Sequence, residues 1–371
     1  MDGSGPGRRR RLPCGVVIAE ALCAIAALYQ LLALFACVRS KKGADGGSQP
    51  LPASILKPVR GADPSLGDAI KSHLALLGQF ELLCGVRVGD PAVNLLGQFP
   101  EVRVVECRIQ TPNGKVGSLI DLERAAMHPL LVVNDADIRV DADYLRRVTA
   151  PLANPQVGLV TCLYRPEGDT FASRFEGLGV STDFAPSALV ARLVGVDEFA
   201  MGSTLAFRRA DLKRIGGFEA LASYLADDYQ LGHRIHALGL KCVLSDVVVT
   251  TRLSGGLADV WRHQVRWART IRVSKFGGYL GLPFTFATLW AVVGIVSGEW
   301  RAGLALLGVR MLMAIEAGWF VLRSRDVLRL FYLIPLRDLF GVAVWAAGLF
   351  GSSVEWRGMR LKLDREGRIV P

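Results

Sequence analysis

The feature that most constrains this chain of 371 residues is the uneven distribution of its apolar residues. Residues 16–38 form an apolar run about long enough to span a bilayer. Three more apolar stretches lie in the last quarter, at 280–298, 303–322 and 328–351. A cleaved signal peptide is the alternative interpretation of the first run. We favour a retained anchor, because the run is longer than a usual signal sequence and no small-residue cleavage pattern follows it.

The middle of the chain alternates between strand and helix patterns. Strands are predicted for the short apolar runs at 54–57, 82–88, 102–107, 130–133, 157–164 and 205–208. Helices are predicted for the periodic segments at 66–77, 116–128 and 229–238. This alternation is typical of an α/β domain with a mostly parallel sheet, whose ligands bind outside the carboxyl ends of the strands. Asp90 and Asp135 both follow a predicted strand, so we expect them at that edge.

These patterns divide the chain into seven segments. They are a basic N-terminal tail (1–15), a transmembrane anchor (16–38), a Gly/Pro-rich linker (39–52), an α/β domain (53–256), an interfacial amphipathic helix (257–276), C-terminal membrane segments (277–352) and a basic tail (353–371). The expected architecture is therefore an α/β domain held between membrane helices.

An acidic pair closes the buried run that starts at Leu130. Asp135 and Asp137 are separated by one residue, so a strand that ends there presents both carboxylates at one edge of the sheet. Mg²⁺ and Mn²⁺ bind one or two such carboxylates together with phosphate oxygens. A turn or a helix N-cap is the alternative, since Asp is favoured there. The context favours a metal site that bridges a diphosphate.

Further polar residues follow the same pattern. Asp90 can accept the imide N–H of uracil, or it can belong to a Gly-Asp-Pro turn. Lys115 can reach a phosphate ahead of a helix, although alone it is indistinguishable from a surface lysine. Asp228 suits a general base that takes a proton from an attacking hydroxyl. Asp227 and Asp228 also fit the first turn of a helix, where the dipole favours acids.

The segment 257–275 has the pattern of an interfacial helix. Arginines recur at three- and four-residue spacing and form one basic stripe, at positions 262, 266, 269 and 272. Within it, Arg266 offers forked hydrogen-bond donors to diphosphate oxygens, and Trp267 offers a flat wall for an acceptor. Both residues can instead be ordinary members of the helix. Their position after the acidic motifs favours the functional interpretation.

Ionisable residues interrupt the last apolar stretches. Arg337 and Asp338 lie within 328–351, and Glu316 lies within 303–322. Such groups are costly in a membrane and usually face a cavity or each other. One interpretation is an Arg-Asp pair that only packs the helices. The other is a polar pocket for a lipid headgroup, and we assign Arg337 and Asp338 to the acceptor on that basis.

The formal net charge of +10 does not indicate nucleic-acid binding. The basic residues cluster beside apolar segments, at 8–11, 39–42 and 262–275, where anionic lipid headgroups attract them. The seven cysteines form no CxxC pattern, so neither a zinc site nor a disulfide framework is expected.

With these residues identified, the chain resembles family 2-type glycosyltransferases, most closely the ceramide glucosyltransferase family with its bacterial relatives. The segment 55–64 is similar to the first-strand motif of that family, and the three-acid pattern falls on Asp90, Asp135 and Asp228. The closing motif, Gln or Arg followed by two residues and Arg-Trp, falls on 263–267, with His263 in place of Gln or Arg.

The resemblance implies a GT-A fold, a UDP-sugar donor, a divalent metal and inversion at the anomeric carbon. It assigns Asp90, Lys115 and Asp135 to the donor, Asp135 and Asp137 also to Mg²⁺ or Mn²⁺, and Asp228 to the base. Arg266 and Trp267 are assigned to the donor, and Trp267 also to the acceptor together with His263. A group of hopanoid-modifying glycosyltransferases is similar over the same span.

The expected function is transfer of a hexose, glucose, from a UDP-sugar to the primary hydroxyl of a ceramide-like membrane lipid. The alternatives are N-acetylglucosamine transfer to a hopanoid polyol, a polysaccharide synthase and a non-catalytic scaffold. We expect a multi-pass membrane protein whose catalytic domain faces the cytoplasm, where nucleotide sugars are found. The arginines at 8–11 and the basic residues at 39–42 favour opposite orientations of the first span.

Overall fold

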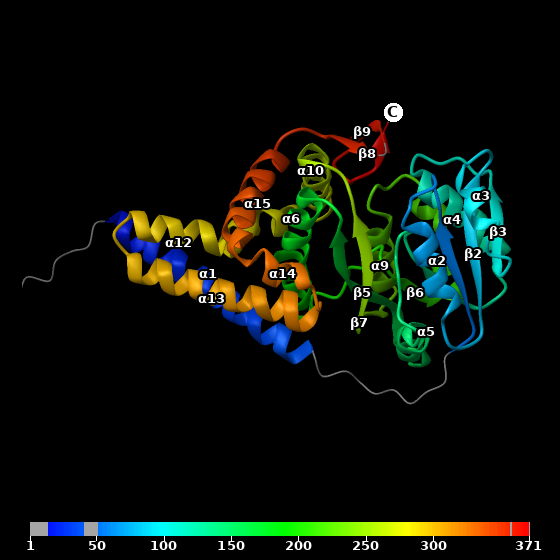
Figure 1. Ribbon diagram of the computed structural model, residues 1–371, viewed down its shortest axis with the longest axis horizontal. Helices are drawn as coiled ribbons and strands as arrows, with labels where there is room; N and C mark the ends of the chain where they lie inside the picture. Colours follow the sequence, from blue (N-terminus) through cyan, green and yellow to red (C-terminus); the bar gives the residue numbers. More distant parts are fainter. Residues whose placement is uncertain (1–13, 41–50, 357, 371) are drawn as a thin grey trace, which may run out of the picture.

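The computed structural model describes residues 14–40, 51–356 and 358–370. Most of the predicted N-terminal tail and linker, including the basic residues at 8–11 and at 41–42, lies outside the described residues. The described chain forms a sheet-containing domain and a group of long helices, which lie at opposite ends of the molecule (Figure 1).

The described part of the α/β domain contains one seven-stranded sheet with the order β3-β2-β1-β4-β6-β5-β7. Its strands are β1 (Ala53–Pro58), β2 (Phe80–Arg87), β3 (Val102–Cys107), β4 (Leu130–Val133), β5 (Val157–Gly168), β6 (Leu205–Arg208) and β7 (Lys241–Leu253). Only β6 runs antiparallel to its neighbours β4 and β5 in this sheet. The prediction of a mostly parallel sheet is therefore confirmed.

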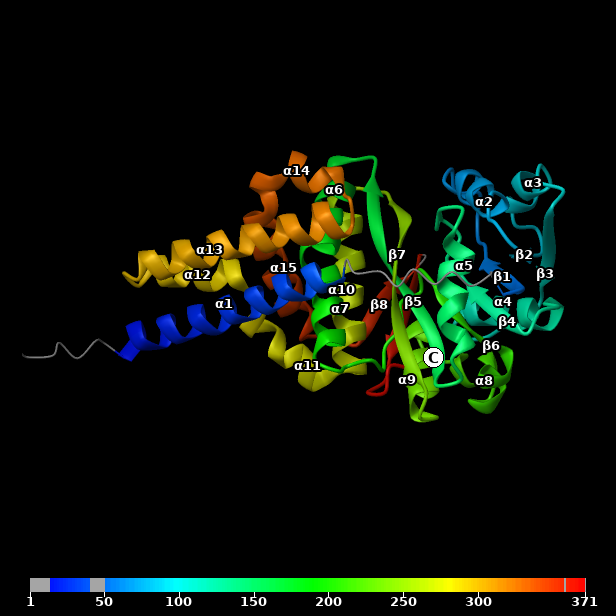
Figure 2. The ribbon, with the colours of Figure 1, turned by 90° about the horizontal axis from the view of Figure 1, so that it is seen from below.

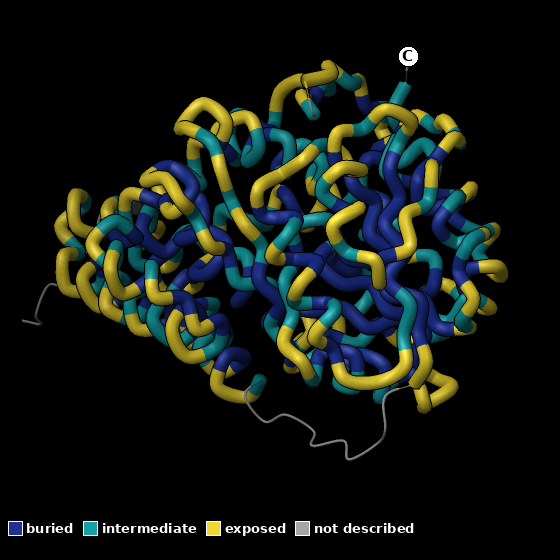
Figure 3. The backbone as a smooth tube through the Cα atoms, turned by 45° about the vertical axis from the view of Figure 1, so that its right-hand side comes forward, coloured by how far each residue is buried: buried dark blue, intermediate teal, exposed yellow. Residues whose placement is uncertain are grey.

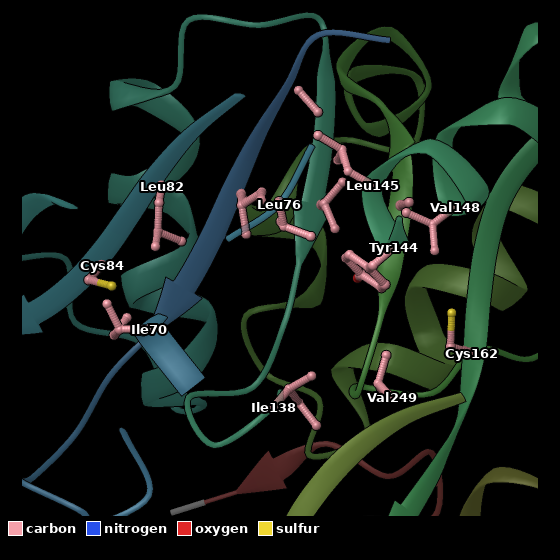
Figure 4. Close-up of a cluster of buried hydrophobic side chains, with 14 of the residues drawn as sticks. Ile70, Leu76, Leu82, Cys84, Ile138, Tyr144, Leu145, Val148, Cys162 and Val249 are labelled. Carbon is pink, nitrogen blue, oxygen red and sulfur yellow. The ribbon is translucent and has the colours of Figure 1, made fainter. Parts of the chain in front are cut away.

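Helices cover both faces of the sheet, which explains why every residue of β1 is buried. Neighbouring residues of β1 point to opposite faces, so Ile55 and Leu56 belong to two different apolar clusters. The Ile55 cluster includes residues of α2 (Leu66–Leu74) and α5 (Tyr144–Thr149), and Figure 4 shows part of it. The Leu56 cluster includes residues of α4 (Gly114–Ala125), α8 (Arg209–Arg214) and α9 (Asp227–Ala237). Short elements complete the domain: α3 (Ala92–Leu96), η1 (Ala150–Ala153) and η3 (Phe218–Leu221).

The helical end of the molecule contains the apolar stretches. Helix α1 (Cys14–Ser40) packs against α12 (Ala287–Val296) and α13 (Trp300–Ile315), as Figure 2 also shows. Three described helical segments are long and apolar enough to cross a membrane: Ile18–Ser40, Trp300–Val321 and Phe331–Gly348. A bent pair, Phe276–Thr285 and Ala287–Val296, meets at 46° and passes the same test as one unit. The remaining elements here are α11 (Phe276–Gly281), η4 (Leu282–Thr285), η5 (Glu316–Val321), η6 (Phe331–Leu333) and α15 (Ile334–Gly348).

Large apolar side chains remain on the outside of this bundle. Leu28 is 69% exposed and Val296 is 82% exposed. Figure 3 shows the same contrast between an exposed helical end and a sheet whose backbone is mostly buried. Exposed apolar surface of this extent indicates contact with lipid rather than with water. The chain is therefore a membrane-associated protein.

A layer of helices lies between the sheet and the bundle (Figure 1). It contains α6 (Phe171–Gly179), α7 (Ala185–Leu193) and α10 (Leu257–Ser274), which are labelled in Figure 2, while α14 (Arg325–Arg329) packs against α6, α13 and η5. Helices α6 and α7 are joined by a single π-helical turn, η2 (Val180–Phe184). π-turns inside helices are often found at functional sites.

The segment predicted as a basic C-terminal tail is folded. Strands β8 (Ser353–Trp356), β9 (Met359–Leu363) and β10 (Ile369–Val370) form a small antiparallel sheet. Val354 and Leu363 are buried against Leu225 of the α/β domain. The expected tail is thus corrected, because charged residues mask a short alternation of apolar and polar positions that period-2 strands use.

Candidate active site

Two of the three predicted acids follow parallel strands, and the third begins a helix. Asp135 follows β4, Asp90 follows β2, and Asp228 lies in the first turn of α9. Strand β1 lies between β2 and β4, so Asp90 and Asp135 are at the same edge of the sheet but two strands apart. The sequence predicted this edge because carboxyl ends of parallel strands coincide.

Two buried side chains hold the backbone around Asp135. Lys57 of β1 is fully buried and donates from Nζ to the carbonyl oxygens of Asp135 (2.9 Å) and Ile138 (3.3 Å). Burial lowers the pKa of Lys57 to about 8. Asn134 is also buried, and its Nδ2 donates to the Tyr144 hydroxyl (2.9 Å) and to the Ser203 carbonyl (2.7 Å). Sequence reasoning gave neither residue a role, since their partners are distant in the chain.

Lys115 joins the strand-end acid to the helix acids. Its Nζ lies 2.8 Å from Asp135 Oδ1 and 3.4 Å from Asp227 Oδ2. Burial lowers the pKa of Lys115, but Asp135, Asp227 and Asp228 together raise it above its ordinary value, so the ammonium stays charged. The local cause of its placement is Asn113, which caps α4 by accepting from the backbone N–H groups of Lys115 (3.0 Å) and Val116 (3.4 Å).

Asp228 completes this cluster. Its Oδ2 accepts from the Gly202 N–H (2.8 Å) and its Oδ1 accepts from the Tyr229 N–H (2.8 Å). Burial, and then the neighbouring Asp227, raise the pKa of Asp228 to about 6, although Lys115 opposes the rise. A carboxylate with this pKa can take up a proton near neutral pH.

Gly202 marks the point where the three side chains meet. A Cβ placed on Gly202 would lie 3.2 Å from Asp135 Oδ2, 3.3 Å from Asp228 Oδ2 and 3.3 Å from Lys115 Nζ. The structure thus brings Asp135, Lys115 and Asp228 together, as predicted, around a glycine that the sequence did not single out. Any side chain at position 202 would enter the cluster.

Asp90 and Asp137 are engaged by backbone groups near the same edge. Both oxygens of Asp90 accept from the Gly61 N–H (3.0 Å each), and Oδ1 also accepts from the Ala92 N–H (2.9 Å). Asp137 Oδ2 accepts from the Thr251 hydroxyl and from the Arg252 N–H (3.1 Å). Burial, and then Asp135, raise the pKa of Asp137. Asp90 therefore lies outside the Gly202 cluster, next to the loop that follows β1.

The carboxylates near this edge can be compared with the ligands that a divalent metal ion requires. Among the described residues, no group of three or more His, Cys, Asp or Glu side chains is placed to hold an ion by itself. Asp135 and Asp137 are two hard oxygen donors, the number that Mg²⁺ or Mn²⁺ uses when phosphates and water complete its coordination. The Asp135 side chain is 44% exposed. These residues fit an ion that binds together with a diphosphate.

A row of rings connects the acids with α10. The Trp267 ring lies 6.0 Å from Phe184, and Phe184 lies 5.5 Å from Tyr164, measured between centroids. Tyr164 is close enough to Asp228, Glu176 and Asp135 that their charges, after burial, raise its pKa. The rings therefore place Trp267 on the side of the site that faces the membrane helices, and Arg266 precedes it on the same helix.

His263 is anchored by a carboxylate that sequence reasoning missed. Its Nδ1 lies 2.6 Å from Oε1 of Glu176, a buried residue of α6, and its ring lies 4.6 Å from Trp267. Gln264 Nε2 donates to the same Glu176 oxygen (2.8 Å). His263 replaces the Gln or Arg of the family motif, and it is still a side chain that can form hydrogen bonds. The Glu176 carboxylate therefore holds the ring of His263 next to Trp267.

The assignment of Asp338 to the acceptor is corrected by the structure. Its oxygens accept from Arg310 Nη2 (2.6 Å) and Nε (2.9 Å), and the Thr288 hydroxyl also donates to it. Arg310 Nη1 donates in turn to the Thr182 carbonyl of η2 (2.9 Å). Asp338 is therefore committed to a buried ion pair that links α12, α13, α15 and η2.

Arg337 does not pair with its neighbour Asp338. Its Nη2 donates to Gln264 Oε1 (2.8 Å), and its guanidinium lies over the ring of Phe340 at 5.3 Å. A Cβ on Gly179 would lie 2.1 Å from Arg337 Nη2, so the guanidinium crosses α6 where only glycine leaves room. Arg337 thus lies behind the 263–267 motif, next to Glu176 and Gln264.

Three arginines of the basic stripe of α10 have partners within the protein. Arg269 donates to the carbonyl oxygens of Phe350 (3.0 Å) and Ser353, and Arg272 donates to those of Leu349 and Gly351. Arg262 pairs with Asp259. The contact of this stripe with lipid headgroups stays a prediction, because periodicity shows which residues share a face but not what covers it. At positions 269 and 272 the guanidinium groups bind backbone carbonyls instead.

A seven-stranded sheet of this order, with acids at its carboxyl edge, defines the GT-A class of glycosyltransferases. Among solved structures, a mannosyltransferase of Pyrobaculum calidifontis, PcManGT in complex with GDP-Man and Mn²⁺, aligns with a TM-score of 0.53 and 19% identity over 90% of this chain and 97% of that one. The model of glycosyl transferase family 21 matches residues 18–369, and the chain belongs to that family. It is an enzyme of glycosyl transfer, and the predicted resemblance is confirmed.

Curated relatives carry related names. Ceramide glucosyltransferase 1 of Caenorhabditis elegans is 27% identical over 52% of this chain and 43% of its own length. Ceramide glucosyltransferase 3 of the same organism is 23% identical over 86% of this chain and 74% of its own length. The β-monoglucosyldiacylglycerol synthase of Synechocystis is 27% identical over 51% of this chain and 38% of its own length. The chain thus spans less than half the length of the first and third relatives.

Proposed function

We propose that this enzyme transfers glucose from a UDP-sugar to the primary hydroxyl of a ceramide-like membrane lipid, with inversion at the anomeric carbon. The observation that carries the proposal is the convergence of Asp135, Lys115 and Asp228 at Gly202. A row of rings leads from this cluster towards apolar helices. A charged donor and an apolar acceptor would meet there.

In the proposed mechanism, Asp228 takes the proton of the lipid hydroxyl as its oxygen attacks the anomeric carbon from the face opposite the diphosphate. The backbone N–H groups of Gly202 and Tyr229 hold this carboxylate in place. Lys115 supplies positive charge next to the departing diphosphate, and Arg266 adds forked donors from α10. Trp267 provides an apolar wall for the acceptor.

Two further assignments belong to the proposal. Asp90 would accept a hydrogen bond from the base of the nucleotide. Asp135 and Asp137 would hold Mg²⁺ or Mn²⁺, and that ion would neutralise part of the charge that develops on the leaving diphosphate. Because nucleotide sugars are cytosolic, we place the α/β domain on the cytoplasmic side of the membrane.

The test compares Asp228→Asn with Asp141→Asn, which neutralises an exposed carboxylate outside the cluster. We expect Asp228→Asn to bind UDP as the wild type does but to transfer sugar about 10²- to 10⁴-fold more slowly, the usual contribution of a general base. Asp141→Asn should be unaffected. Mass spectrometry of the lipid product measures transfer, and near-normal turnover by Asp228→Asn would remove the base assignment.

Substrate choice needs a crossed assay. The purified full chain is offered UDP-glucose or UDP-N-acetylglucosamine with ceramide, diacylglycerol or a hopanoid polyol. We expect glucosylceramide as the main product, carrying one sugar. A product with N-acetylglucosamine on the hopanoid would replace the proposal with our second candidate, and a lipid-free polymer would indicate a polysaccharide synthase.

A further inference from the structure

The small C-terminal sheet touches two segments that carry site residues. We call residues 353–370, which contain β8, β9 and β10, the C-terminal meander. In Figure 1 β8 and β9 lie beside α10, and in Figure 2 β8 lies between α10 and α9. Helix α10 carries Arg266 and Trp267, and α9 begins with Asp227 and Asp228.

On one side, the meander hydrogen-bonds to the loop before α9. The Ile369 N–H donates to the Ser223 carbonyl (2.7 Å), and the Leu225 N–H donates to the Gly367 carbonyl (3.3 Å). Arg368 Nε donates to the Tyr224 hydroxyl (3.1 Å), and its guanidinium lies 5.6 Å from the centre of that ring. The meander thus extends its own sheet with the loop 223–225, three residues before Asp228.

On the other side, the meander and the segment before it are held by α10. Arg269 and Arg272 donate to carbonyl oxygens between positions 349 and 353, as described above. Val273 of α10 packs in one apolar cluster with Leu225, Val354 and Leu363. This cluster joins α10, the meander and the loop before Asp228 by direct contact.

Asn113 binds the same loop from the side of the candidate active site. The Asn113 N–H donates to the Ala222 carbonyl (2.9 Å), and Asn113 Nδ2 donates to the Tyr224 carbonyl (2.7 Å). Asn113 is the residue that caps α4 in front of Lys115. The loop is therefore held between Asn113 and the meander. If either set of contacts is removed, the loop is held from one side only.

We propose that the C-terminal meander is a positioning element that holds the loop 223–225, and through it Asp228, in a fixed relation to the α10 motif. Arg368 and Ile369 act as positioning residues through Tyr224 and Ser223. The inference rests on the proposed function, because it assumes that Asp228 is the base and that α10 contributes to the same reaction.

Release of the loop should lower the pKa of Asp228, an effect that a loss of global stability would not produce. Burial is the main cause of the raised pKa of Asp228, so a loop that admits water would lower this pKa towards 3.8. The rate of transfer would fall because the carboxylate is misplaced. The KM for the donor would stay, since Asp90 and Asp135 are held by other elements. Loss of the loop contacts also leaves intact the hydrogen bonds from α10, which carries Arg266, to the segment before β8.

The experiment uses the full chain in detergent or nanodiscs with two variants and one control. Ile369→Pro removes the N–H that donates to Ser223, while the Arg368 carbonyl can still accept from the Asp364 N–H (3.0 Å). Arg368→Gln removes the guanidinium next to Tyr224. Arg365→Gln, in the exposed turn of the same meander, loses the same charge away from the loop.

We expect amide hydrogen exchange of residues 223–228 to become about tenfold faster in Ile369→Pro and Arg368→Gln, and to stay unchanged in Arg365→Gln. In the first two variants kcat should fall about tenfold at constant donor KM, and the acid limb of the pH–rate profile should move to lower pH. Wild-type exchange in both variants would overturn the proposal. Faster exchange with unchanged kcat and an unchanged acid limb would also overturn it.

Failure of the proposed function is recognised separately. In that case the wild-type chain transfers no sugar to any of the lipids offered, whatever the variants do. Hydrogen exchange needs no substrate, so it still decides whether the meander holds the loop.

Discussion

The pKa of Asp228 predicts the pH below which the rate of transfer falls, which we call the acid limb of the pH–rate profile. With a pKa of about 6, roughly 90% of the carboxylate is ionised at pH 7 and about 10% at pH 5. A base must be ionised to accept the hydroxyl proton, so kcat/KM at pH 5 should be about one-tenth of its value at pH 7. An ordinary Asp with a pKa of 3.8 would remain mostly ionised at pH 5 and would show almost no loss.

Two neighbours should move this limb in opposite directions. Lys115 lowers the pKa of Asp228, so Lys115→Met should shift the limb to higher pH. Asp227 raises the same pKa, so Asp227→Asn should shift it to lower pH. The ratio of the rates at pH 5 and pH 7 reports the limb even when a variant is slow.

The assay follows the glycolipid product at saturating lipid and limiting donor, between pH 4.5 and 8 in steps of about half a unit, which resolves a limb set by one group. A wild-type limb near pH 4 would refute the reasoning, because Asp228 would then be hydrated like a surface acid. Shifts of the same sign in Lys115→Met and Asp227→Asn would refute it as well, since the effect would not be electrostatic.

Three other changes test single contacts. Gly202→Ala places a methyl group 3.2–3.3 Å from three charged side chains and should lower kcat about 100-fold, as measured by product formation, with little change in thermal unfolding. Arg310→Met leaves Asp338 buried without its cation and should cost about 3–5 kcal/mol of stability, whereas Arg310→Met with Asp338→Leu should recover most of it, as measured by denaturant unfolding in detergent. Lys57→Met removes the donor for two buried carbonyl groups and should cost about 1–3 kcal/mol, measured in the same way. Lys57→Arg should not restore this stability, because a larger, planar guanidinium would replace the ammonium at a fully buried position.

The sequence predicted the parts of the site that depend on local order. The strand 130–133 is followed closely by Asp135, and the carboxyl end of a parallel strand lies at the ligand-binding edge of the sheet, so the position of this acid follows from the local sequence. Lys115 and Asp228 could be expected near it because each lies in the first turn of a helix that starts at the same edge and runs back towards the start of the next strand. Their meeting point at Gly202 could not be predicted, because it depends on how three distant segments pack.

Tertiary partners explain the remaining differences between expectation and structure. Asp338 pairs with Arg310 rather than with its neighbour Arg337, and no pattern within α15 identifies a partner in α13. The arginines of α10 have the spacing of a lipid-facing stripe, yet Arg269 and Arg272 bind the backbone before β8. The meander itself contains so many charged residues that its short strands resembled a tail.

The ion pair between Arg310 and Asp338 also has a consequence for biogenesis. The two residues are 28 positions apart, so at about 5–20 residues per second the ribosome makes Asp338 roughly 1–6 s after Arg310. During that interval an arginine in the middle of a nascent span would face hydrocarbon without its counter-ion, at a cost of about 2.5–3.5 kcal/mol. We expect α13 to wait beside the translocon until α15 emerges, so that Arg310 enters the lipid already paired with Asp338.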